Sequence, residues 1–70
     1  MDQVTIQRLR LGERIKSLRI SKEMSRYALA KSAGIREPTV KSIEEAECIP
    51  RFDNIVRIAE ALSTPLRDLF

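Results

Sequence analysis

The chain has 70 residues and a net charge of +3, and 43% of its residues are hydrophobic although only three are aromatic. A chain of this length forms one small domain, and few glycines and prolines favour an all-α fold over an all-β one. With no histidine and a single cysteine, Cys48, it has no internal disulfide and no evident metal site or catalytic residues, so we expect no cofactor and no enzymatic activity. No apolar run reaches the roughly 18 residues of a membrane span.

Apolar residues recur at helical spacing along the chain, and nothing resembles a linker or a repeat. We therefore expect one compact domain over residues 1–70, with residues 1–4 as a flexible N-terminus. The five predicted helices cover residues 5–21, 26–32, about 37–45, about 52–62, and a last segment that starts at Pro65.

The first and last predicted helices have clear local signals. In the first, Leu11, Ile15 and Leu18 form an apolar stripe that faces a core. In the last, Thr64 is expected to act as the N-cap and Pro65 to occupy the first turn, where no helical donor is lost.

Residues 25–45 contain two short amphipathic helices separated by a tight turn. Ser25 is a favourable N-cap for the first, and Gly34 can adopt the left-handed conformation that ends it. The second helix has Val40 and Ile43 on its apolar side. Two helices joined by a short turn with glycine are typical of a helix-turn-helix, whose second helix enters the DNA major groove.

Positive charge is concentrated in the first part of the chain. Residues 1–31 contain eight Lys/Arg and three Asp/Glu, a net +5, whereas residues 32–70 contain five and seven, a net −2. This asymmetry favours a polyanionic partner such as DNA, although charged residues also coat solvated faces in many proteins.

These features resemble one known family over the segment from Leu11 to Phe70. The residues that carry the resemblance are Leu11-Gly12-Glu13-Arg14-Ile15, Leu18-Arg19, Leu29-Ala30, Gly34-Ile35, Val40, Ile43-Glu44, Pro50, Ala59 and Ala61-Leu62. They are similar to the phage-repressor and Cro type of helix-turn-helix proteins, the Xre-like family. The resemblance implies a five-helix, lambda-repressor-like domain that docks its third helix in the major groove and regulates transcription, usually as a homodimer on a palindromic operator of double-stranded DNA.

The resemblance also implies roles for individual residues. Arg19 is expected to pair with Glu44 as a structural ion pair. Base contacts are expected from the polar side of the third helix, which consists of Arg36, Glu37, Pro38, Lys41 and Ser42. Phosphate contacts are expected from Ser25, Arg26, Tyr27 and Arg51. For any single member of the base-contacting set, the alternative is a phosphate contact or none.

Three positions depart from the family pattern. Ala46 and Ser63 stand where family members commonly have glycine, so these corners are expected to be shaped differently or to carry strain. Arg36 is a poor N-cap. We also expect Glu45 and Glu47 to point away from phosphates, because a carboxylate facing DNA would weaken binding.

The favoured function is a sequence-specific transcriptional regulator, a repressor or autoregulatory controller, in the cytoplasm of a prokaryote or encoded by a phage. A dimer would use Leu66 or Phe70, or the N-terminal residues Val4 and Ile6, although the same residues could instead close the monomer core. The alternative is an antitoxin or adaptor that binds a partner protein with the same fold, and Glu37 and Pro38 are its main support.

Overall fold

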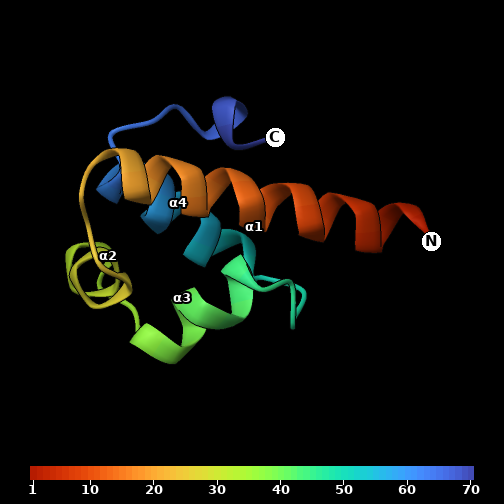
Figure 1. The fold of residues 1–70 in the computed structure, drawn as a ribbon, viewed down its shortest axis with the longest axis horizontal. Helices are drawn as coiled ribbons and strands as arrows, with labels where there is room; N and C mark the ends of the chain where they lie inside the picture. The colour runs from red at the N-terminus through yellow and green to blue at the C-terminus, as the bar shows by residue number, and fades with distance from the viewer.

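The computed structural model describes all residues 1–70 and contains helices but no strands (Figure 1). Its elements are α1 (Gln3–Ser21), α2 (Arg26–Ala33), α3 (Glu37–Glu44), α4 (Phe52–Ala61) and the 3-10 turn η1 (Leu66–Leu69). The all-α prediction is thus confirmed, with four α-helices instead of five. No helix is both long enough and apolar enough to span a bilayer.

The helix α1 begins two residues earlier than predicted. The Asp2 carboxylate accepts a hydrogen bond of 2.8 Å from the Thr5 amide and so caps the helix. Gln3 and Val4, which the sequence analysis assigned to a flexible N-terminus, are therefore helical.

The predicted fifth helix is wrong, because the chain forms only the single 3-10 turn η1. The Thr64 hydroxyl donates to the Leu62 carbonyl oxygen at 3.1 Å and does not cap the turn. Leu69 is buried, whereas Phe70 follows the turn and is 64% exposed. The turn is stabilised by packing of Leu69 in the core.

The core lies between α1 and α4 and extends down to α2 and α3 (Figure 1). Leu11 and Ile15 are buried as the apolar stripe predicts, while Leu18 is half-buried at the edge of the core. The twelve core residues are Leu11, Ile15, Leu29, Ala30, Ala33, Val40, Ile43, Ile55, Ile58, Ala59, Leu62 and Leu69. Every helix contributes to this one cluster, so burial of apolar side chains couples all the elements.

The helices α2 and α3 form the expected pair. The Ser25 hydroxyl accepts from the Ala28 amide at 3.0 Å, and Gly34 ends α2 with φ of 72°. In Figure 1, α2 is seen end-on whereas α3 lies across the view, so the two axes cross. The N-cap and the glycine act as their local chemistry predicts.

Three residues other than glycine have left-handed backbone conformations, each at a turn where the chain leaves a helix. Ala46 has φ of 57° and Ser63 has φ of 52°, so both corners keep the shape that glycine would favour and carry strain. Glu23, after α1, has φ of 55° and was not identified from the sequence. Each of these residues follows the end of a helix, where the chain must reverse direction.

Gly12 allows α1 and α3 to approach closely. A Cβ atom at this position would lie 2.5 Å from the Glu44 carbonyl oxygen and 2.7 Å from that of Ile43. Only a residue without a side chain permits this contact, which places the end of α3 directly on α1.

Candidate nucleic-acid interface

The helix α3 presents a polar face to solvent, which we call the recognition face. Its members are Arg36, Glu37, Pro38, Lys41 and Ser42, of which the first four are exposed and Ser42 is half-buried. Val40 and Ile43 on the opposite side are buried, so burial orients the helix about its axis. Arg36 precedes α3 without making a side-chain cap.

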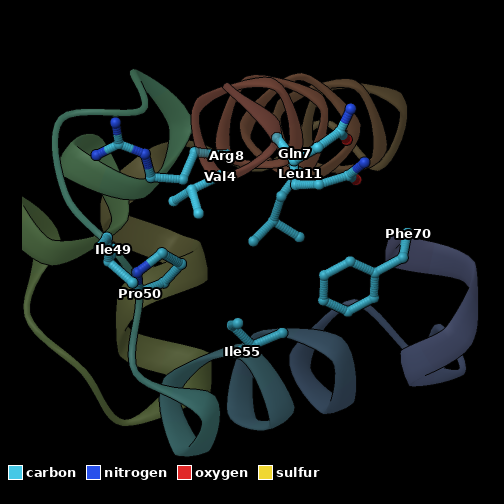
Figure 2. Close-up of a pocket in the computed structure, with 9 residues that line it drawn as sticks. Val4, Gln7, Arg8, Leu11, Ile49, Pro50, Ile55 and Phe70 are labelled. Carbon is cyan, nitrogen blue, oxygen red and sulfur yellow. The ribbon is translucent and has the colours of Figure 1, made fainter. Parts of the chain in front are cut away.

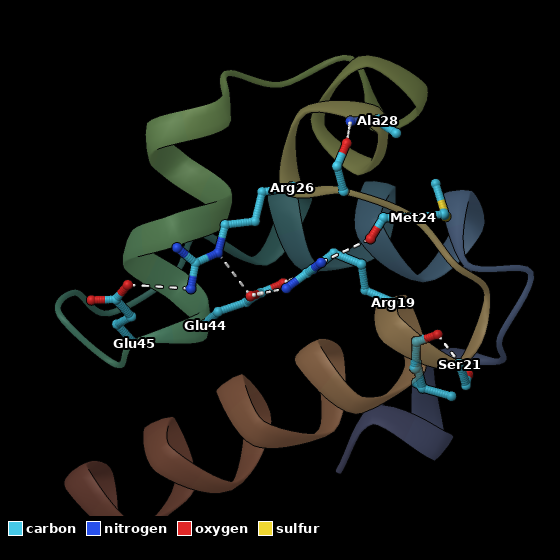
Figure 3. A network of polar contacts seen from close by, with 9 residues as sticks. Arg19, Ser21, Met24, Arg26, Ala28, Glu44 and Glu45 are labelled. Carbon is cyan, nitrogen blue, oxygen red and sulfur yellow. Dashed lines mark hydrogen bonds and ion pairs between the residues drawn. The ribbon is translucent and has the colours of Figure 1, made fainter.

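A buried ion pair attaches α3 to α1 (Figure 3). Arg19 Nε lies 2.6 Å from Glu44 Oε2, and Arg19 Nη2 donates to Glu44 Oε1 at 3.0 Å. Arg19 Nη1 also donates to the Met24 carbonyl oxygen at 2.8 Å. The Glu44 side chain is fully buried, so this bidentate pair fixes the orientation of α3 relative to α1 and to the loop before α2.

Arg26, predicted as a phosphate contact, is a member of the same network. Its Nε donates to Glu44 Oε1 at 3.0 Å, and its Nη2 lies 3.2 Å from Glu45 Oε2. The hydrogen bond with Glu44 raises the pKa of Arg26, with a smaller contribution from the charges of Glu44 and Glu45. The sequence reasoning missed this contact, because the adjacent pair Glu44-Glu45 was not connected with an arginine at the start of α2.

Glu45 also contacts the recognition face. Its Oε1 lies 3.7 Å from Lys41 Nζ, at the helical spacing of i and i+4. Glu45 therefore lies between Arg26 and Lys41, one cation from each helix of the motif.

The other predicted phosphate contacts lie at two places. Ser25 and Tyr27 flank Arg26 at the start of α2, and Tyr27 is exposed. The backbone amides of a first helical turn have no intrahelical acceptors, so this end can bind an anion. Arg51 is at the start of α4, where its Nε lies 3.3 Å from Asp53 Oδ1, and it contacts none of the other predicted site residues by an ion pair.

Comparison with known proteins identifies the family. The sequence profile described as helix-turn-helix matches residues 15–69, which is most of the chain. The chain belongs to this helix-turn-helix family. It is of the Xre and phage-repressor type, as the sequence resemblance implied, and it is a DNA-binding transcriptional regulator.

A solved structure agrees with this assignment. The helix-turn-helix protein is similar to the restriction-modification controller protein C.AhdI from Aeromonas hydrophila, with a TM-score of 0.88 and 30% sequence identity. The similarity covers 90% of this chain and 96% of that chain. No curated protein sequence matches the chain. In this helix-turn-helix protein, α2 is the first helix of the motif and α3 is the second.

Proposed function

We propose that this regulator binds specific double-stranded DNA sequences by inserting α3 into the major groove. The observation that supports this most directly is the exposed recognition face on a helix that the Arg19–Glu44 pair holds rigidly. A firmly held helix can place its side chains in a constant register against base edges.

The recognition face contains donors and acceptors for different bases. Arg36 and Lys41 can donate to guanine O6 and N7, and Glu37 can accept from cytosine N4. Ser42 can contact several bases, while Pro38 offers only packing against a thymine methyl group. A good bidentate contact would discriminate between bases by about 1–3 kcal/mol.

Phosphates would be bound by Ser25, Arg26, Tyr27 and Arg51. The first three lie at the start of α2 beside α3, where the helix dipole favours an anion. Arg26 makes its two ion pairs through Nε and Nη2, which leaves Nη1 to reach a phosphate. With four to six contacts, the logarithm of affinity should fall against the logarithm of salt concentration with a slope of about −4 to −5.

We also propose a controller or repressor role in the cytoplasm of a prokaryote, at the nucleoid. The support is the 30% identity to a protein described as a restriction-modification controller. Regulation of this kind needs specific DNA binding and no catalysis, so we assign no reaction and no cofactor to the chain.

A homodimer on a palindromic operator would complete the site. An apolar groove of about 360 Å³ lies beside α1 and is lined at its centre by Val4, Leu11, Ile49, Ile55 and Phe70 (Figure 2). Phe70, Ile49 and Val4 are all more than half exposed, so a second copy could cover them. Two copies related by a two-fold axis would read half-sites about 10–10.5 base pairs apart.

The test is selection of DNA from a randomised duplex pool, with wild type compared with Lys41→Ala and Arg26→Ala at two salt concentrations. We expect the wild type to enrich a palindrome. Lys41→Ala should relax the selected sequence, because a base contact is lost, whereas Arg26→Ala should weaken binding to all sequences. Absence of both enrichment and salt-dependent binding would contradict the proposal.

The alternative is a protein-binding module of the antitoxin or adaptor kind. It is favoured by the exposed Glu37 and the rigid Pro38 in the recognition face, since a carboxylate there repels phosphates. Salt-dependent binding to the random pool would count against it, and failure to bind any DNA would support it.

A further inference from the structure

Glu45 is placed where it competes with DNA for two cations. Its two carboxylate oxygens lie 3.2 Å from Arg26 Nη2 and 3.7 Å from Lys41 Nζ. Figure 3 shows its side chain extending towards Arg26 from the end of α3, beyond Glu44. The two cations belong to the proposed phosphate contacts and to the recognition face, respectively, so one carboxylate contacts both kinds of DNA-binding residue.

Glu45 is not required to hold Arg26 in place. Arg26 already donates from Nε to the buried Glu44 at 3.0 Å, and that carboxylate is itself fixed by Arg19. The Glu45 side chain is 39% exposed and the Lys41 side chain is 53% exposed, so water screens both of its ion pairs. The main effect of Glu45 should therefore be on a ligand that approaches this surface and not on the fold.

A phosphate and a base edge respond differently to a nearby carboxylate. A phosphate is negatively charged, so Glu45 both repels it and occupies donors that it needs. A guanine edge offers neutral acceptors, and the Lys41 ammonium has three N–H donors, so it can bind Glu45 and guanine together. The carboxylate thus opposes phosphate contacts more strongly than base contacts.

We infer that Glu45 is a specificity-determining residue that disfavours non-operator DNA. Its competition for Arg26 weakens phosphate binding on every sequence, whereas its competition for Lys41 matters most on non-operator DNA, where Lys41 meets a phosphate instead of its base partner. This inference rests on the proposed DNA-binding function. Glu45 was expected to point away from phosphates, and the structure places it beside Arg26, which the proposed function assigns to a phosphate.

The test compares wild type, Glu45→Gln and Glu60→Gln, using the operator selected by the wild type and a random duplex of equal length. Glu45→Gln keeps the side-chain shape and removes its charge. Glu60→Gln is the matched control, because Glu60 is exposed and makes no ion pair. It lies near the C-terminal end of α4, whereas Arg51 lies at the N-terminal end. Circular dichroism melting of each variant would show that the fold is retained.

We expect Glu45→Gln to raise affinity for the random duplex by roughly fivefold and affinity for the operator by about twofold, because the Arg26 contact is common to both and the Lys41 contact is not. The slope of log affinity against log salt on random DNA should become steeper by about one unit. Glu60→Gln should change both affinities equally and only slightly, since it alters net charge alone.

Two outcomes would overturn the inference and can be told apart. If the wild type binds no DNA, the proposed function fails and the inference fails with it. If the wild type selects an operator but Glu45→Gln leaves the ratio of operator to random affinity unchanged or raises it, the inference alone fails.

Discussion

At the scale of single residues, Glu44 has the most demanding environment in the molecule. Its carboxylate is fully buried and accepts hydrogen bonds from two arginines, Arg19 and Arg26. Burying a charge is unfavourable unless its partners compensate for the lost water, and here two guanidinium groups do so. Glu45 adds a second carboxylate beside Arg26, so the two arginines are matched by two glutamates.

Removing the charge of Glu44 should therefore lower the stability of the folded protein. We expect Glu44→Gln to lower the free energy of unfolding by about 3–5 kcal/mol, because Arg19 would remain as an uncompensated buried charge. Urea denaturation followed by circular dichroism would measure the change. Glu45→Gln, which alters exposed ion pairs, should lower stability by less than about 1 kcal/mol, and equal losses for the two variants would argue against this account.

A substitution at Ala46 should instead stabilise the protein, because glycine adopts the backbone conformation of this position with less strain. Ala46 has a φ of 57°, which is unfavourable for any residue with a Cβ atom. We expect Ala46→Gly to raise the free energy of unfolding by about 0.5–1 kcal/mol, the relief of strain exceeding the extra entropy of the unfolded chain.

Thermal or urea unfolding would test the Ala46 substitution against Ala28→Gly. Ala28 lies inside α2, so glycine there should instead destabilise the protein by about 1 kcal/mol. A loss of stability in Ala46→Gly comparable to the control would show that the corner is not strained.

At the scale of elements, the start of α1 depends on the charge of Asp2. The hydrogen bond from the Thr5 amide holds the pKa of Asp2 below its usual value, and the Thr5 hydroxyl and the Arg8 charge act in the same direction. The folded pKa is thus lower than the unfolded one. The stabilisation of this helix end is complete above the unfolded pKa and is lost as pH falls through the folded pKa.

We expect the first turn of α1 to fray as Asp2 becomes protonated. The amide proton of Thr5 should shift with the titration of Asp2 in an NMR pH series, while amides at the centre of α1 should not. Asp2→Asn retains the acceptor and removes the charge, so the shift of Thr5 should then lose this titration. If the chemical shift of the Thr5 amide proton did not change with pH in the wild type, the Asp2 cap would be ruled out.

At the scale of the whole molecule, three of the exposed apolar residues come together from distant parts of the chain. Val4 from α1, Ile49 from the loop before α4, and Phe70 after η1 meet around one groove (Figure 2). Arg8 also lines this groove and adds a cation to its rim. These features support the proposed homodimer.

We expect Phe70→Ser to shift the protein towards monomer in sedimentation equilibrium and to weaken operator binding at low protein concentration. The reason is that a dimer would cover the 64% of Phe70 that is exposed in the monomer. Phe52→Ser, which alters an aromatic of similar exposure outside the groove, is the control. Unchanged sedimentation for Phe70→Ser would exclude this surface from the dimer interface.

The sequence by itself determined the local features of this fold. Local chemistry predicts the helix α1 from its apolar spacing, the start of α2 from the Ser25 cap and its end from Gly34. Each of these signals acts over only a few residues. The same local rules failed near Pro65, where Thr64 and Pro65 resemble a helix start but the Thr64 hydroxyl donates back to Leu62 and a 3-10 turn forms.

Only the tertiary structure decided that Arg26 joins the buried ion pair. Arg26 and Glu44 are separated by 18 positions, and no periodic pattern connects them. They are brought together by the crossing of α2 and α3, by the close approach at Gly12, and by burial of Val40 and Ile43. The pairing of Arg26 with Glu44 and Glu45 is therefore a product of packing, because side-chain pairing between helices depends on how whole elements are oriented by a shared core.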